Sequence, residues 1–190
     1  MNIENLNKLI RGRRSVYPPN YKDQPIPDSL IRTVLENANW APTHKMTEPW
    51  RFVVIRKDKL PGLSQFIGNY YTTQHPGDSF SEKRYQKMTG NILGSGCIIA
   101  IGIKRDLSEV LPEWEEIAAV AMAVQNMWLT CTALGVGSYW GTSAAALSAV
   151  DYVGFEKGVR CLGFFYMGYL NEEHNQPGNR SSVENKVIWL

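Results

Sequence analysis

The sequence lacks the features that would assign it to several special classes of protein. It has three cysteines in 190 residues, and they form neither a CxxC pair nor the even number that a disulfide framework needs. No apolar run approaches the length of a membrane span. The first ten residues mix acidic and amide side chains with spaced apolar ones, unlike a signal peptide. We therefore expect buried, reduced thiols, no membrane association and a cytoplasmic location.

The chain also lacks an excess of charge of either sign. Lysine and arginine number 20, aspartate and glutamate 18, and the formal net charge is +2. This balance argues against nucleic acid or an anionic membrane as a partner. We also predict no metal site. Because 44% of the residues are apolar and no linker or repeat divides the chain, we expect one domain over residues 1–190.

Apolar spacing predicts the main helices and strands. Helical spacing indicates a short helix from residue 3 and longer helices at 27–41 and 113–134, whereas apolar runs indicate strands at 52–55, 97–103, 136–140 and 162–170. The glycine-rich segment 57–96 is expected to hold short helices and a mobile part that covers a site. The helix at 113–134 is apolar nearly all round, which places it inside the monomer or between two copies. The apolar tail at 187–190 should pack on the body or on a second copy. The order of elements predicts an α+β fold with a central sheet.

The stretch from Trp40 to Val54 joins a helix to a strand and carries His44 and Lys45. Two prolines, at positions 42 and 49, favour an extended and stiff connection. Such a loop at a sheet edge is a common place for a ligand site. A lone histidine beside a proline turn is about as often a structural hydrogen-bonding residue, and a single lysine is usually solvated. Neither side chain is therefore assigned as a catalytic acid.

The first helix leads into the sequence R-G-R-R-S, which crowds arginines against Ser15. Guanidinium groups and a hydroxyl suit the oxygens of a phosphate, because charge-assisted and bidentate hydrogen bonds are the strong ones. The alternative is a solvated basic turn that the helix dipole favours at a helix end. The local sequence leaves both interpretations open.

A glycine-containing segment follows the longest predicted helix. Gly135 has the position of a helix C-terminal cap. The spacing of Gly135, Gly137 and Gly141 does not fit a dinucleotide-binding loop, and these glycines follow a helix instead of opening one, so we reject that interpretation. The backbone around Gly141 is either placed to face a flat ligand or is a plain turn from strand to helix. Its neighbours are Trp140, Thr142 and Ser143.

Taken together, these motifs resemble the nitroreductase family of flavin enzymes, in particular its small members with a histidine-lysine loop. The resemblance covers nearly the whole chain. It rests on R-R-S at residues 13–15, A-P-x-H-K-x-x-x-P-W at 41–50, the long helix with Q-N at 125–126, and G-S-Y-W-G-T-S at 137–143. It implies a nitroreductase-like α+β fold with a central mixed sheet flanked by helices. It also implies an interlocked homodimer with FMN at the subunit interface.

The resemblance also implies roles for individual residues. Arg13 and Ser15 would hold the FMN phosphate or ribityl chain, with Arg14 beside them, and Arg180 matches a late basic residue that grips the phosphate. The loop with His44 and Lys45 would reach the cofactor, with the other subunit as one possible source. A backbone N–H would lie near flavin N5 where the chain runs along the isoalloxazine ring, at Trp140, Gly141, Thr142 and Ser143. Many relatives have asparagine and glutamine where this chain has Met46 and Glu48, so we expect different contacts to the ring edge.

The activity that the resemblance implies is that of an FMN-dependent NAD(P)H oxidoreductase. NADPH or NADH would pass hydride to flavin N5 and leave, and a nitroaromatic, quinone or similar electron-poor acceptor would then be reduced, which is a ping-pong mechanism. No side chain is assigned as catalytic, because the flavin carries the chemistry. Lys45, then His44, would stabilise negative charge on the reduced ring. Two alternatives stay open: a flavin-binding sensor or carrier without efficient NAD(P)H turnover, and an interaction module without flavin. The weak net charge argues against a nucleic-acid partner for such a module.

Overall fold

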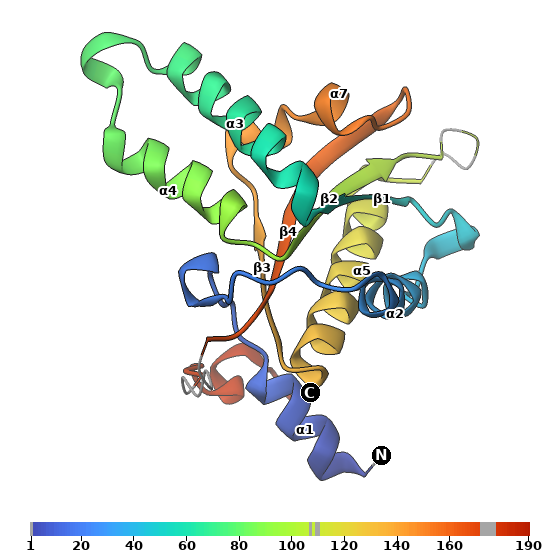
Figure 1. The fold of residues 1–190 in the computed structure, drawn as a ribbon. Coiled ribbons are helices and arrows are strands. Elements are labelled where there is room, and N and C mark those ends of the chain that lie inside the picture. The colour runs from blue at the N-terminus through green and yellow to red at the C-terminus, as the bar shows by residue number, and fades with distance from the viewer. Residues whose placement is uncertain (1, 107, 109–110, 172–177) are drawn as a thin grey trace.

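The fold is a four-stranded sheet with helices on both faces (Figure 1). The computed structural model describes residues 2–106, 108, 111–171 and 178–190. Within these residues the strand order is β1-β2-β4-β3. The strands are β1 (Trp50–Arg56), β2 (Cys97–Lys104), β3 (Val136–Gly141) and β4 (Val159–Tyr169). The predicted α+β class and the four predicted strands are confirmed.

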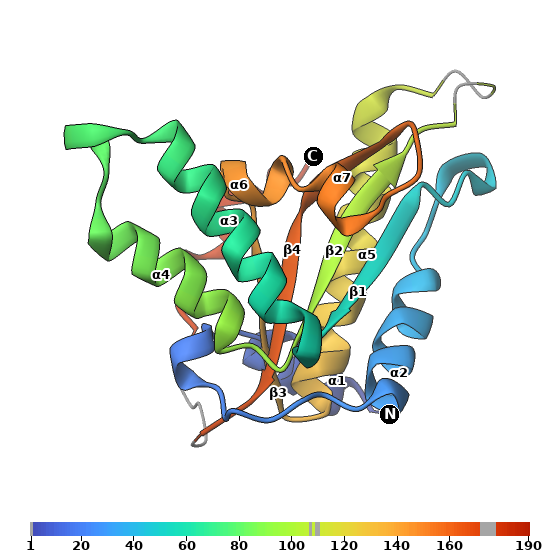
Figure 2. The same cartoon turned by 45° about the horizontal axis from the view of Figure 1, so that its top comes forward.

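Helices form the two outer layers (Figure 2). The helices α2 and α5 cover one face of the sheet, and α3, α4, α6 and α7 cover the other. α1 lies at one end of α5. Their bounds are α1 (Ile3–Gly12), α2 (Asp28–Asn39), α3 (Leu60–Gln74), α4 (Glu82–Leu93), α5 (Glu113–Ala133), α6 (Ala144–Leu147) and α7 (Val150–Val153).

One detail of the expected sheet needs correction. Every pairing between the described strands is antiparallel, so the sheet contains no parallel pair there and is not mixed. The reason lies in the connections. The single helix α5 joins β2 to β3, and these two strands run in the same direction, but β4 lies between them. The α3–α4 hairpin joins β1 to β2 and reverses the chain, which makes that pair antiparallel.

The segment 57–96 forms a helical hairpin rather than the short helices predicted. α3 has 15 residues and α4 has 12. Leu63, Ile67 and Tyr71 are buried on one face of α3, so burial outweighs the unfavourable helix propensity of glycine. At Gly68 a side chain would lie 2.9 Å from the ring of Tyr85, which shows how closely the two helices approach. Mobility of this segment stays a prediction.

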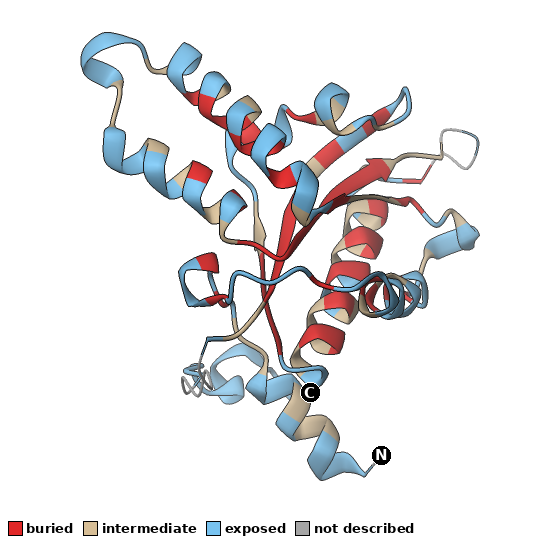
Figure 3. Ribbon diagram, in the orientation of Figure 1, coloured by how far each residue is buried: buried red, intermediate tan, exposed pale blue. Residues whose placement is uncertain are grey.

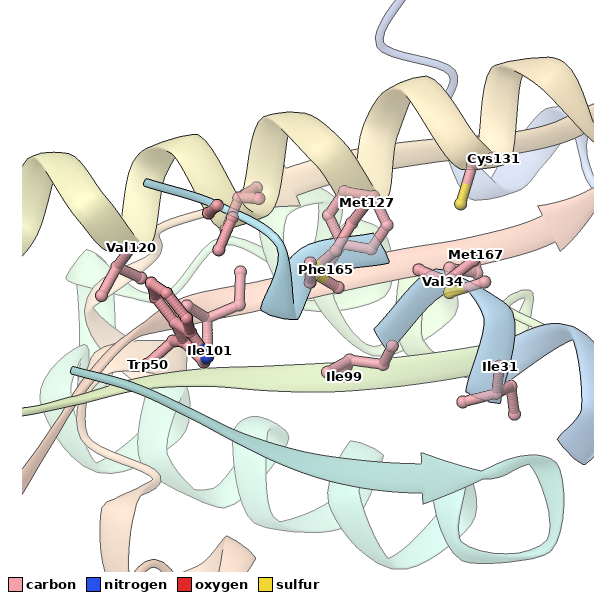
Figure 4. Close-up of a cluster of buried hydrophobic side chains, with 14 of the residues drawn as sticks. Ile31, Val34, Trp50, Ile99, Ile101, Val120, Met127, Cys131, Phe165 and Met167 are labelled. Atoms are coloured by element: carbon pink, nitrogen blue, oxygen red, sulfur yellow. The ribbon is translucent and has the colours of Figure 1, made fainter. Parts of the chain in front are cut away.

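Alternate residues of the central strands belong to two separate hydrophobic cores, one on each face of the sheet. Ile99 and Ile101 of β2 pack with α2 and α5 on one face (Figure 4), whereas Ile98 and Ala100 pack with α3 and α6 on the other. Figure 3 shows the buried residues along β2, β4 and the sheet-facing side of α5. All three cysteines are buried and unpaired, as predicted. Burial raises the pKa of the Cys97 and Cys131 thiols to about 12.

Both ends of the described chain expose apolar side chains. No residue of α1 is buried, and Ile188 and Trp189 are 86% and 82% exposed. The tail therefore does not pack on the body of its own protomer, which leaves a second copy as the predicted cover. No helix among the described residues is long and apolar enough to cross a membrane.

Candidate functional site

The arginine turn after α1 is fixed by the long helix α5. The guanidinium carbon of Arg13 lies 4.5 Å from the ring centroid of Trp128, a cation–π distance. The indole Nε1 of Trp128 donates hydrogen bonds to the carbonyl oxygens of Arg14 and Ser138, both at 3.1 Å. One tryptophan thus connects the turn to α5 and to β3. Apolar spacing placed Trp128 in the long helix, but the sequence did not indicate its contact with the arginine turn.

The three arginines predicted to bind phosphate converge at this turn. Burial lowers the pKa of Arg13 most, and the charges of Arg180 and then Arg14 lower it further. The guanidinium of Arg14 donates to the carbonyl oxygens of Arg11 and Arg13 at 2.7 Å. It also packs against Gly178, where any side chain would overlap it. The segment around residue 180 therefore lies directly on the turn, and Ser15 is exposed beside it.

The arginine cluster has an unsatisfied group at its centre. Within the described chain, Nη1 of Arg13 is buried and has no hydrogen-bond partner. A buried donor without a partner costs about 1–3 kcal/mol, and more when it is charged. Neighbouring like charges add to this cost. An oxyanion would satisfy the donor and offset the repulsion, so the residues fit the phosphate group predicted for this place.

The end of β3 is shaped by an irregularity in β4. Leu162 is an extra residue between the pairs that Gly163 and Cys161 make with β2, and such a bulge redirects a strand. Trp140 Nε1 donates to the bulged carbonyl of Leu162 at 3.0 Å. Gly163 has a φ of +119°, and a side chain there would overlap the carbonyl oxygen of Gly141. The bulge thus holds the exposed turn that begins at Gly141 close against β4.

The turn at 141–143 has the geometry of a strand-to-helix connection. The Ser143 hydroxyl accepts a hydrogen bond from the Ala146 N–H at 3.2 Å and caps the short helix α6. The same turn also opens onto a cavity of about 260 Å³. Lys87 and Asn91 of α4 face this cavity from the other side. Sequence reasoning missed both, because the segment 57–96 carries no motif that sets these two positions apart.

The two prolines predicted that the loop of His44 and Lys45 is extended along its whole length. The structure shows that it is not. It contains a tight turn in which Lys45, Met46 and Glu48 have φ values of 48°, 56° and 41°. The Thr43 hydroxyl accepts from the Glu48 N–H at 3.1 Å and closes the turn. Non-glycine residues rarely adopt positive φ, so this backbone is strained and specifically held.

His44 connects this loop to the start of α5. Its Nδ1 lies 2.5 Å from Oε2 of Glu115, whereas Arg13 contacts Trp128 near the other end of the same helix. The helical rise between Glu115 and Trp128 amounts to roughly 20 Å. Within one protomer the structure therefore brings together Arg13, Arg14 and Arg180, but it does not bring His44 to them. No group of three or more histidine, cysteine or carboxylate side chains among the described residues could hold a metal ion.

Comparisons with known proteins agree with this architecture. The model of the nitroreductase family matches residues 10–169, and the chain belongs to that family. It is 28% identical over 139 residues to the Bacillus subtilis protein named "Putative NAD(P)H nitroreductase YfhC", which covers 71% of this chain and 68% of that protein. A nitroreductase-like family protein from Bacillus cereus superposes with a TM-score of 0.80 at 23% identity over 97% of this chain and 95% of the other. The FMN-dependent nitroreductase NfnB from Mycobacterium smegmatis, solved in complex with NADPH, gives a TM-score of 0.78 at 16% identity over 98% of both chains.

Proposed function

We propose that this protein is an FMN-dependent oxidoreductase that takes hydride from NADPH or NADH and reduces nitroaromatic, quinone or similar electron-poor acceptors. The observation that carries the proposal is the converging set of Arg13, Arg14 and Arg180, with a buried guanidinium nitrogen that has no hydrogen-bond partner among the described residues. Membership of the nitroreductase family supports it. The names of YfhC and NfnB, which mention NAD(P)H and FMN, support it further.

The arginine cluster would bind the phosphate of FMN. Its guanidinium groups supply fixed donors and positive charge, and Ser15 adds an exposed hydroxyl at the same turn. Because this anchor is remote from the reacting atoms, it would contribute binding that is equal in ground state and transition state. The backbone from Trp140 to Ser143 would lie along the ring. Bound FMN supplies hydride transfer between donor and acceptor, so no side chain is needed as a catalytic residue.

A second copy of the chain would complete this site. The strained loop with His44 and Lys45 lies roughly 20 Å along α5 from the arginine turn, so it would reach an FMN held by the partner's arginines. Lys45 would then place a cation near the charge that develops when the ring is reduced. The glutamate contact of His44 orients the loop. By the family resemblance, Met46 and Glu48 stand where many members would carry amides, so the ring-edge contacts should differ.

Exposed apolar side chains support the homodimer. Trp40, at the end of α2, is 80% exposed. It lines a surface pocket between α2 and α5 together with Leu134 and Leu129. Apolar side chains gathered on one face mark an interaction site more often than scattered ones do. The same side of α5 carries Asn126, whose amide donates to the Asn37 carbonyl at 3.0 Å and ties the two helices together.

The visible spectrum of the purified protein tests this function. We expect a yellow protein that retains FMN through gel filtration and bleaches promptly when NADPH or NADH is added without oxygen. Acceptor should then restore the colour, and initial rates should give the parallel-line pattern of a ping-pong mechanism. A yellow protein that bleaches with neither donor would favour the flavin-binding sensor or carrier. A colourless protein that takes up no FMN would contradict the proposal.

A further inference from the structure

The cavity beside Gly141 has a charge pattern of its own. Lys87, from α4, is the only residue with a formal charge among the described residues that line it, and none of these carries a carboxylate. No described residue forms an ion pair with Lys87. Because no described residue of the lining carries a negative charge, the Lys87 ammonium group gives the cavity a positive potential.

Aromatic rings form the opposite wall. Tyr139 and Tyr166 are stacked with centroids 4.4 Å apart and planes 11° apart, and Tyr17 lies 4.7 Å from Tyr139. Burial raises the pKa of Tyr139, and it raises that of Tyr166 to about 12. Both hydroxyls are thus neutral at physiological pH. Asn91 Nδ2 donates to the Tyr139 hydroxyl at 3.4 Å. The lining of the cavity as a whole combines π-surfaces with neutral polar groups and one cation.

The size of the cavity limits what it can hold. Its volume of about 260 Å³ lies below the roughly 300–1,000 Å³ of sites for drug-sized ligands. It suits one substituted aromatic ring, which would pack against tyrosine in an offset or edge-on arrangement. A dinucleotide is too large to enter it as a whole. The positive potential favours a ring with an anionic substituent.

We propose that this cavity binds the electron acceptor and that Lys87 selects aromatic acceptors with a carboxylate or similar anionic group. The inference rests on the proposed function, because the acceptor must meet a flavin placed along residues 140–143. Lys87 is a specificity residue and takes no part in the redox step. The phosphates of the nicotinamide donor are a second source of anionic groups, and the experiment separates the two sources.

A pair of acceptors that differ only in charge tests this role on the FMN-loaded enzyme. 4-Nitrobenzoate and 4-nitrobenzamide share the ring and the nitro group. Lys87→Gln should raise KM for the benzoate about tenfold, as expected for the loss of one charge-assisted contact. KM for the amide, KM for NADPH and kcat with either acceptor should stay within about twofold of their wild-type values. Lys87→Arg should retain most of the preference.

Lys83→Gln is the matched control. Lys83 is an exposed lysine one turn earlier on α4 that does not line the cavity, so its removal changes the net charge equally. A binding measurement complements the kinetics. Benzoate, which the enzyme cannot reduce, should perturb the absorption of oxidised flavin. The Kd for benzoate should be about tenfold higher in Lys87→Gln than in wild type. It should increase with salt concentration in wild type but not in Lys87→Gln.

Four results would overturn the role of Lys87. The first is an equal rise of KM for the benzoate and for the amide in Lys87→Gln, and the second is an equal rise of KM for the benzoate in Lys83→Gln. The third is a change in Lys87→Gln that is confined to KM for NADPH, and the fourth is weaker FMN binding by Lys87→Gln. The last would assign the cavity to the flavin itself. A wild-type protein that no nicotinamide reduces would instead contradict the proposed function. Normal reduction without any effect of acceptor charge would contradict only the inference about Lys87.

Discussion

Arg13 is the residue at which folding and binding make opposite demands. Its guanidinium is partly buried on Trp128 and faces the charges of Arg14 and Arg180, and one of its nitrogens has no hydrogen-bond partner in the part of the chain that the structure describes. Such a group destabilises the protein unless an anion compensates it. Binding of an anionic ligand would offset this cost, whereas a neutral side chain at this position would not carry it.

Replacing Arg13 should therefore separate affinity from chemistry. Arg13→Ala should raise the Kd for FMN roughly tenfold to a hundredfold, since charged hydrogen bonds contribute about 1.5–3 kcal/mol. It should leave kcat nearly unchanged in protein saturated with FMN. The FMN-free variant should unfold within about 1 kcal/mol of wild type, because the lost cation–π contact is offset by relief of repulsion. Fluorescence titration of FMN and thermal denaturation measure the two effects.

The exposed Arg11, in the last turn of α1, provides the control. Arg11→Ala removes the same charge but keeps the backbone carbonyl that Arg14 uses, so its effect on FMN affinity should be several times smaller. Equal affinity of wild type and Arg13→Ala for FMN would remove Arg13 from the phosphate site.

At the residue scale, the sequence drew attention to residue types that suit a ligand, but it did not predict which distant side chains contact them. The crowding of arginines before Ser15 left a phosphate site and a solvated basic turn both open. The family resemblance added Arg180 to the predicted phosphate-binding residues, and in the structure the charge of Arg180 acts on Arg13. Trp128 and Lys87 could not be identified in the same way. Their contacts with the turn and with the cavity join residues far apart in sequence, and neither residue type is distinctive in a helix.

At the scale of elements, the bulge in β4 positions the end of β3. Gly163→Ala should cost about 2–5 kcal/mol of unfolding free energy, because it combines strain at a φ of +119° with overlap against the Gly141 carbonyl. Any variant that folds should bind FMN more weakly, since the backbone at 141–143 must shift. Urea denaturation and FMN titration test both parts.

Gly90→Ala is the matched control for the bulge. Gly90 lies in α4, and a side chain there would meet no atom within 4 Å. The substitution should stabilise the protein by about 0.5–1 kcal/mol through helix propensity. If Gly163→Ala were equally harmless, the bulge would not hold the turn at Gly141.

Apolar spacing predicted which elements exist but not how they are connected in space. It indicated α5 and the four strands, because burial on one or both faces leaves a periodic pattern. The antiparallel order depends on β4 inserting between β2 and β3, which no local pattern encodes. The turn at residues 43–48 was missed for a related reason. Positive φ at three non-glycine residues is imposed by Thr43 and by contacts with α5, whereas the prolines indicated only extension.

At the scale of the whole molecule, the two parts of the proposed site lie far apart in the described protomer. The arginine cluster lies toward the C-terminal end of α5, and the loop with Lys45 lies at its start. Apolar side chains remain uncovered on the same helix layer and at the tail. An antiparallel second copy packed on this layer would place each loop at the partner's cluster and would cover the apolar surface.

FMN affinity should therefore depend on dimerisation. Trp40→Asp places a charge on the exposed α2–α5 surface and should yield monomers in sedimentation experiments at micromolar concentration. These monomers should bind FMN at least about tenfold more weakly, because the loop with Lys45 is lost from the site although Arg13 is intact. Leu93→Asp is the control, since Leu93 is an exposed leucine on α4 in the opposite layer. Wild-type protein diluted until it dissociates should likewise release FMN, which tests the coupling without any substitution. Monomers that hold FMN with native affinity would show that a single protomer forms the whole site.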